Sequence, residues 1–160
     1  MNRSDHINIR KAVIEDAIDI MPLYIELMNL HGEYLPSAFK IVKNIDKKEI
    51  ENEIKAYEYF YVCLNDKKII GYEKGIYKEV EESDVLLYRN MITILDLIIE
   101  KEYRNNRIGK EMLKFIEGIA KDKGISSIEI PVYAFNRQAN VFYNKNGYET
   151  YVERKVKIIN

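Results

Sequence analysis

Residues 91–99 constrain the fold of this chain more than any other segment. Thr93 and Asp96 are the polar residues in this otherwise apolar run. A near-continuous apolar run of this length is typical of a strand that is covered on both faces. Such a strand lies inside a sheet with helices packed above and below it. We therefore expect residues 86–99 to form the middle strand of a layered fold.

The segments around this strand alternate between strand and helix patterns. Strand patterns cover residues 6–12, 57–64, 69–77, 126–132 and 148–159, and helical patterns cover residues 14–30, 46–56, 107–123 and 136–144. Pro22 would kink the first helix or mark a second start, and turn-forming residues 31–36 should end it. Interleaved strands and helices indicate an α/β or mixed α+β fold. We expect one domain over residues 1–160, with its core in residues 7–159.

Charge and hydropathy exclude several classes of function. The 25 basic and 26 acidic side chains give a net charge of −1, which lacks the basic excess that nucleic-acid binders use against phosphates. We therefore expect no nucleic-acid partner. No apolar run approaches the roughly 18 residues of a membrane span, and the polar start is unlike a signal peptide. We expect a soluble, cytoplasmic protein with no membrane partner.

Cysteine and histidine are too scarce for other kinds of site. Cys63 is the single cysteine, so the chain cannot form an internal disulfide. Its position in a predicted strand favours a small buried hydrophobe over a nucleophile. His6 and His31 are the two histidines and cannot supply a three-histidine metal centre. We predict no metal.

The segment after residues 91–99 has the features of an anion-binding site. A short loop leads into a helix that begins near Arg107, and the first turn of a helix leaves backbone N–H groups free. Arg104, Arg107 and Lys110 add positive charge at this end, where cations oppose the helix dipole. The arrangement predicts a bound phosphate or diphosphate; the alternative is that these charges are simply solvated.

This loop does not match the common nucleotide-binding motifs. Gly109-Lys110-Glu111 has one glycine, and a glutamate stands where a Walker A loop needs a hydroxyl. Residues 104–109 resemble instead the acetyl-CoA loop of the GCN5-related N-acetyltransferase (GNAT) superfamily, Arg/Gln-x-x-Gly-x-Gly/Ala. Arg107 replaces the first glycine of that pattern. We expect Arg107 to adopt the ordinary right-handed helical conformation and to contact phosphate itself; otherwise the affinity for CoA is weakened.

A second segment carries the same resemblance. Residues 136–148 are similar to the family's Asn-x-x-Ala-x-x-x-Tyr-x-x-x-Gly-Phe/Tyr motif, with Asn136, Tyr143 and Gly147 in place. The resemblance implies the GNAT fold, a mostly antiparallel, splayed sheet flanked by helices. It also implies that the pantetheine arm of acetyl-CoA lies in the gap beside the strand that ends near Ile99.

The cofactor site follows from the same resemblance. Backbone groups at the end of the strand would bind pantetheine, and the loop and helix start would bind the diphosphate. Asn136 would reach the cofactor or cap its own helix, and Asn105 or Asn106 could cap the preceding one. The residues implied to bind acetyl-CoA are Leu97, Ile98, Ile99, Arg104, Asn105, Asn106, Arg107, Ile108, Gly109, Lys110, Asn136 and Tyr143.

Two side chains are candidates for the chemistry. The resemblance implies that Tyr143 lies beside the thioester sulfur and protonates the departing thiolate, and an ordinary tyrosine pKa of about 10 suits a proton donor. The alternative is that Tyr143 is a buried aromatic of the core. Asp96 is a carboxylate in an apolar strand, so it is a candidate base and substrate contact, or else a hydrogen-bonded structural residue. Glu100 is a reserve base.

The acceptor side is assigned by analogy with the family. His31, Glu33, Tyr34 and Phe39 lie in the region that lines the family's acceptor site, and Tyr34 is our candidate substrate-binding residue. The acidic residues 79–84 would either steer a cationic amine or simply solvate a loop.

The sequence therefore predicts an acetyl-CoA-dependent N-acetyltransferase that moves an acetyl group to a primary amine by direct attack. Its acceptor would be a small molecule or a peptide. The alternatives are a non-catalytic module that senses CoA or acyl-CoA, an interaction module, and an acetyltransferase for protein N-termini or lysines. An exposed edge of the closing strand could also pair two chains into a homodimer.

Overall fold

A five-stranded sheet forms the centre of the protein in the computed structural model, which describes residues 7–159. Its strands lie side by side in chain order; neighbouring strands are antiparallel except for β4 and β5, which are parallel. The bounds are β1 Ile7–Lys11, β2 Tyr59–Asn65, β3 Lys68–Val80, β4 Arg89–Ile99 and β5 Ser127–Glu129. As predicted, β4 has a neighbour on each edge, although it begins only at Arg89. His6, predicted to begin the first strand, lies outside the described residues.

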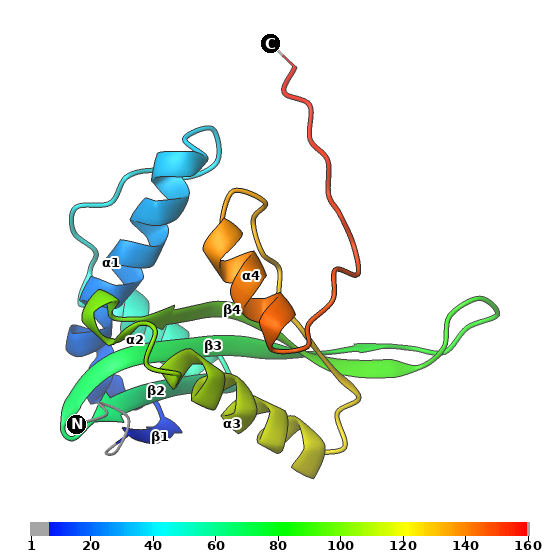
Figure 1. Cartoon of the computed structure of the whole chain (residues 1–160), viewed down its shortest axis with the longest axis horizontal. Helices are drawn as coiled ribbons and strands as arrows, with labels where there is room; N and C mark the ends of the chain where they lie inside the picture. The colour runs from blue at the N-terminus through cyan, green and yellow to red at the C-terminus, as the bar shows by residue number, and fades with distance from the viewer. Residues whose placement is uncertain (1–6, 160) are drawn as a thin grey trace.

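Helices cover both faces of this sheet (Figure 1). Their bounds are α1 Ala17–Tyr34, α2 Lys47–Ala56, α3 Ile108–Asp122 and α4 Arg137–Lys145, with short 3-10 turns η1 Ile14–Asp16 and η2 Lys101–Tyr103. The α1 and α2 helices pack on one face, and α3 and α4 pack on the other. The α3 helix supplies the crossover that a parallel β4–β5 pair requires.

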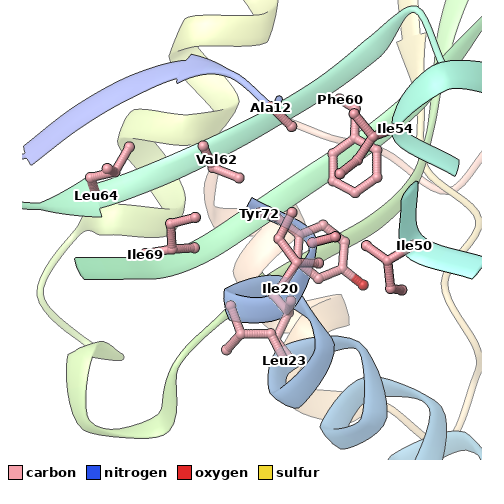
Figure 2. Packing of buried hydrophobic residues seen from close by; sticks show 12 residues of the cluster. Ala12, Ile20, Leu23, Ile50, Ile54, Phe60, Val62, Leu64, Ile69 and Tyr72 are labelled. Atoms are coloured by element: carbon pink, nitrogen blue, oxygen red, sulfur yellow. The ribbon is translucent and has the colours of Figure 1, made fainter. Parts of the chain in front are cut away.

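Apolar side chains fill the core on both faces of the sheet. On the first face, Ile20 of α1 and Ile50 of α2 lie in one buried cluster with Tyr72 of β3 (Figure 2). On the second face, Ile116 of α3 is buried with Ile92 of β4. Because β4 contributes to both clusters, its apolar run is explained by burial on two sides.

The β4 strand carries an irregularity in its middle. Asp96 lies opposite Lys74 of β3, and Ile94 lies opposite Gly75. Leu95 is therefore an extra residue on β4, which makes a β-bulge. Bulges bend a strand and increase its twist, so the end of β4 turns away from the direction of its first half.

The β5 strand accompanies only the first part of β4. The parallel ladder joins residues 91–93 to β5 and ends there. The strand is shorter than predicted for residues 126–132, because residues 130–135 leave the sheet. Beyond Thr93, β4 has no strand on this edge within residues 7–159. The sheet is therefore splayed between β4 and β5, which confirms the architecture that the resemblance implies.

The α1 helix continues to Tyr34, which lies inside the turn predicted at residues 31–36. Gly32 lies inside the helix and does not end it. It is buried against residues 40–41, which pass close to this turn of α1. A Cβ on Gly32 would lie 3.0 Å from the carbonyl oxygen of Lys40, so this glycine permits a close approach. Pro22 lies inside the helix on its exposed side, and the helical pattern persists across it.

The closing strand predicted for residues 148–159 is absent, and this segment has neither helix nor strand. Its beginning is held by the ring of Tyr148 against Tyr143, 5.8 Å between centroids, and by the Arg89 Nη1 group, which donates to the Tyr151 hydroxyl at 2.9 Å. Alternation of apolar and polar residues predicted a strand, but a strand also needs a ladder with a neighbour. The segment instead runs away from the sheet (Figure 1). The strand edge at which we expected two chains to pair is therefore absent, and the homodimer itself stays a prediction.

The β3 and β4 strands extend beyond the other strands as a long hairpin (Figure 1). Glu79 and Val80 belong to β3 rather than to the predicted loop at residues 79–84. The hairpin tip points away from α1 and α4, which favours the interpretation that its acidic residues are solvated. In the part of the chain described, no helix is both long and apolar enough to cross a membrane.

Candidate active site

The start of α3 presents backbone donors that the helix itself does not use. The first helical bond runs from the Glu111 N–H to the Arg107 carbonyl at 3.1 Å. The N–H groups of Ile108, Gly109 and Lys110 precede that bond. With the dipole of a 15-residue helix behind them, these groups favour an anion. This is the geometry expected for a phosphate or diphosphate.

Arg107 does not have the conformation that we predicted. Its φ of 65° and ψ of 0° lie in the left-handed region rather than the right-handed helical one. This conformation costs a residue with a Cβ about 1–2 kcal/mol, and glycine adopts it freely. The loop therefore has, at position 107, the backbone conformation that suits the glycine of the family's motif, although this chain has an arginine there. Asn105 has a φ of 64°, which asparagine tolerates better than most residues.

The two asparagines of the loop do not cap α3 as predicted. Arg107 is the N-cap residue, and its own side chain makes no capping hydrogen bond within residues 7–159. Asn106 Nδ2 donates instead to the carbonyls of Tyr103 and Arg104, at 3.2 Å each. Asn106 therefore shapes the loop, and Asn105 supplies one of its left-handed positions.

Arg104 is engaged within the protein. Its Nε donates to the Ile99 carbonyl at 2.8 Å, and its Nη2 pairs with Glu26 of α1. The guanidinium thus ties α1 to the end of β4, and its charge is compensated. These contacts favour a structural role over the phosphate contact predicted for Arg104.

Gly109 allows α4 to pack on the start of α3. A Cβ at this position would lie 3.0 Å from Cζ of Phe142. Beside this contact, α3 and the end of α4 border a hollow. Three lysines help to line it, and its lining residues are Lys110, Leu113, Lys114, Glu117, Lys145 and Asn146. Lys110 and Lys114 of α3 and Lys145 of α4 place positive charge beside the helix start, and Lys114 also pairs with Glu111 at 3.4 Å.

The open edge of β4 presents the backbone of every second residue. The Glu100 N–H bonds to the Ile70 carbonyl of β3 at 2.7 Å. Because strand residues direct their backbone groups to alternate edges, Ile98 also faces β3, whereas Leu97 and Ile99 face the gap left by β5. The backbone of Ile98 therefore pairs with β3. It does not face the gap in which we predicted that it binds pantetheine. The Ile99 carbonyl already accepts a hydrogen bond from Arg104. The groups left to bind a ligand at this edge are the N–H groups of Leu97 and Ile99 and the Leu97 carbonyl.

Tyr143 of α4 lies against β4 at this opening. It belongs to the buried cluster of Ile92 and Ile94, and its side chain is 9% exposed. Burial raises its pKa above the ordinary value, and the charges of Glu73 and Asp96 raise it further. The phenol therefore keeps its proton throughout the neutral range, as a proton donor must.

Asn136 and Ile108 have structural side chains. Asn136 Oδ1 accepts a bond from the Ala139 N–H at 3.0 Å, which makes it the cap of α4, one of its two predicted roles. Ile108 is buried in the cluster around Cys63. Any contact of Ile108 with a cofactor would therefore come from its backbone.

Asp96 is not the isolated carboxylate that the sequence indicates. On the α1/α2 face, its Oδ2 lies 2.8 Å from Lys74 Nζ and accepts a bond from the Tyr72 hydroxyl at 3.2 Å. The same lysine pairs with Glu53 of α2 at 2.7 Å. Asp96 is 8% exposed, and the buried charge is thus compensated. Both contacts use Oδ2, so Oδ1 is the atom left for an acceptor.

Aromatic rings join the end of α1 to the segment that follows β5. Tyr34 stacks on Phe135 with 4.7 Å between ring centroids, and His31 lies 5.0 Å from both Phe39 and Tyr133. Burial lowers the pKa of His31, although Asp96 opposes this effect, so the imidazole is neutral at neutral pH. Its Nδ1 is buried without a hydrogen bond among residues 7–159. His31, Tyr34 and Phe39 therefore belong to one group of rings, and His31 lies close enough to Asp96 to be affected by its charge. Glu33, also predicted for the acceptor side, is exposed.

Glu73 is a buried acid on the opposite face of β3. Its side chain is 1% exposed, and neither carboxylate oxygen has a hydrogen-bond partner in the described part of the chain. Burial, together with the charge of Glu117, raises its pKa to about 8. Burial also raises the pKa of the Cys63 thiol to about 12, which makes Cys63 a poor nucleophile, as expected.

The family assignment follows from comparison with known proteins. The model of the Acetyltransferase (GNAT) family matches residues 24–148, which is most of the chain and includes both motifs, β4 and α3. The chain belongs to the GNAT family. It is an acetyl-CoA-dependent N-acetyltransferase, and acetyl-CoA is its co-substrate.

Individual relatives of this GNAT acetyltransferase support the assignment. Spermidine N(1)-acetyltransferase of Thermoplasma acidophilum is 27% identical over 154 residues, which is 89% of this chain and 88% of that protein. The structure of the PaiA N-acetyltransferase from T. acidophilum in complex with coenzyme A has a TM-score of 0.69 at 27% identity and 89% coverage of each chain. A mutant of the Bacillus halodurans BH1408 protein has a TM-score of 0.86 at 20% identity, covering 95% of this chain and 99% of that one; this likeness shows the fold alone.

Sequence reasoning missed the residues that surround Asp96 in this acetyltransferase. Lys74 and Glu53 lie far from Asp96 in the chain and meet it only through the register of β3 with β4 and the packing of α2. One signal was present, because Glu73 and Lys74 are adjacent charges inside the apolar strand predicted at residues 69–77. Adjacent strand residues face opposite sides of a sheet. Glu73 and Lys74 therefore cannot both face solvent or both face one partner, and each is a signal of a polar site in the core.

Proposed function

We propose that this GNAT acetyltransferase acetylates the primary amine of a small molecule, which reaches Asp96 from the α1/α2 face. The observation that carries the proposal is the position of Tyr143 at the open edge of β4, next to the start of α3. This arrangement brings a proton donor, an unused strand edge and an anion site together. The similarity to an enzyme named for spermidine supports a small amine as the acceptor.

The residues present fit acetyl-CoA. Its diphosphate would lie on the N–H groups of Ile108, Gly109 and Lys110, because these donors have no partner in α3. Its third phosphate would lie near the lysines of the hollow between α3 and α4. When bound, acetyl-CoA supplies an acetyl group activated as a thioester.

The open edge of β4 would orient the pantetheine arm. The N–H groups of Leu97 and Ile99 and the Leu97 carbonyl point into the gap where a neighbouring strand would lie. Amide groups of an extended ligand can pair with such an edge as a strand does. An N–H group aimed at the thioester oxygen would stabilise the negative charge that develops there.

Asp96 and Tyr143 would handle the protons from opposite sides of β4. Asp96 Oδ1 would orient the acceptor amine and accept its proton, while Lys74 and Tyr72 fix the carboxylate through Oδ2. Tyr143 would donate the phenol proton to the sulfur as the thiolate leaves. Tyr34 and the neighbouring rings would border the body of the acceptor.

The test is release of CoA with a panel of primary amines, compared between wild type and Tyr143→Phe. We expect kcat to fall by about 10²-fold, the usual scale for losing a general acid, with the KM for acetyl-CoA nearly unchanged. Tyr61→Phe is the matched control, because Tyr61 is a half-buried tyrosine that packs on Phe115 of α3, away from the opening. An unchanged kcat in Tyr143→Phe would remove Tyr143 from the mechanism.

Two results would redirect the proposal. Binding of acetyl-CoA without turnover of any amine would favour a CoA sensor, the alternative that Arg107 in place of glycine suggests. Acetylation of peptide N-termini or lysines in preference to small amines would move the acceptor class to proteins.

A further inference from the structure

The ammonium group of Lys74 lies in a site built from the groups that proteins use to bind a primary ammonium. Glu53 and Asp96 contact it at 2.7 and 2.8 Å, and the rings of Tyr57 and Tyr24 lie 4.9 and 5.6 Å away. Carboxylates and aromatic faces are the standard partners of an ammonium. Lys74 is 5% exposed, so the chain fills this site with its own side chain.

Lys74 keeps its charge in this setting. Burial lowers its pKa, but Asp96 and Glu53 outweigh burial and hold the pKa above the ordinary value. The protonated amine has no lone pair with which to attack a thioester, so Lys74 is not itself an acceptor. It acts as a permanent positive charge beside the carboxylate that the proposed mechanism uses.

The charge count around Asp96 decides what kind of amine can bind. The charged groups in direct contact are two carboxylates and one ammonium, which leave one net negative charge. Glu26, an acid on α1, is likewise neutralised by Arg104. An acceptor with one positive charge matches this balance. A second ammonium on the acceptor would meet Lys74 instead of a free carboxylate.

We propose that Lys74 sets the charge class of the acceptor by occupying the ammonium site between Asp96 and Glu53, so that the enzyme prefers monoamines to di- and polyamines. The inference rests on the proposed function, because it concerns the acceptor side of the same site. Specificity of this kind comes from a built-in repulsion as much as from attraction.

The experiment compares butylamine with 1,4-diaminobutane, which have the same carbon chain and differ by one ammonium. For wild type, kcat/KM should favour butylamine by at least about tenfold, since a buried charge mismatch exceeds the 1.4 kcal/mol that tenfold requires. In Lys74→Met, where two carboxylates lack a counter-ion, the ratio should shift by at least about tenfold toward the diamine. Lys78→Met removes an exposed lysine from the same strand and should leave the ratio unchanged.

A double variant separates charge from shape and protects the test against misfolding. Lys74→Met/Glu53→Gln restores one net negative charge without the lysine, so its ratio should return toward that of wild type. If Lys74→Met does not fold, the wild-type ratio carries the test. A wild type that favours the diamine tenfold, a folded Lys74→Met with the wild-type ratio, or a double variant that keeps a tenfold diamine preference overturns the proposal.

Failure of the proposed function is distinguishable from failure of this inference. If no amine is acetylated by any variant although acetyl-CoA binds, the proposed function is wrong. Calorimetric titration of 1,4-diaminobutane then tests the inference without turnover. Binding to Lys74→Met at least about tenfold tighter than to wild type supports it, and equal binding by the two proteins overturns it.

Discussion

The buried acid Glu73 should make the stability of the protein depend on pH in one direction. Its pKa is about 8 in the folded protein, against an ordinary value of 4.5. Below pH 4.5 the group is protonated in both the folded and the unfolded state and has no effect. Between these values the unfolded state loses the proton first, so rising pH favours unfolding. Above pH 8 the effect is constant.

The size of the effect follows from the displacement of the pKa. About 3.5 pH units, at 1.36 kcal/mol each, correspond to about 5 kcal/mol of unfolding free energy lost between pH 4.5 and pH 8. Glu73→Gln has nearly the same shape but no titrating proton. We therefore expect the variant to match wild type near pH 4.5 and to be more stable by about 5 kcal/mol above pH 8.

Urea denaturation of both proteins across this pH range measures the difference directly. Titration of other groups cancels, because both proteins contain them. Glu82→Gln, which removes an exposed carboxylate of the hairpin, should track wild type at every pH. A difference between Glu73→Gln and wild type that does not change with pH would refute the reasoning, since it would mean that Glu73 is ionised or solvated in the folded state.

Two further substitutions test the backbone. Arg107→Gly should raise the unfolding free energy by about 0.5–1 kcal/mol, because relief of the left-handed conformation exceeds the added entropy of glycine in the unfolded chain; lower stability in urea denaturation would show that the Arg107 side chain makes stabilising contacts. Gly32→Ala should cost about 1–3 kcal/mol, because its Cβ would press on the Lys40 carbonyl and force the chain to move, and an unchanged melting temperature would contradict this packing.

The parts of the fold that sequence reasoning predicted are those with a strong local signal. The apolar run at residues 91–99 indicated a strand buried on both faces, and β4 is such a strand. The apolar spacing after Arg107 indicated α3, whose bounds differ from the prediction by one residue at each end. Both signals reflect the environment of one element, so no knowledge of distant residues was needed.

The predictions that failed depend on distant residues or on backbone shape. Residues 148–159 alternate as a strand does, but alternation does not supply the neighbour that a strand pairs with. Arg107 has a left-handed backbone that its residue type disfavours, and only the loop around it explains that. Asp96 was taken for an isolated carboxylate because its partners Lys74 and Glu53 are brought to it by sheet register and helix packing.

A crystal structure of the protein with bound CoA would be decisive for the site. The diphosphate should lie on the N–H groups of Ile108, Gly109 and Lys110, with the pantetheine amides opposite Leu97 and Ile99 in the gap beyond Thr93 and the sulfur next to the Tyr143 hydroxyl. Density for CoA at another place on the surface, with the gap between β4 and β5 empty, would contradict the mechanism proposed for this acetyltransferase.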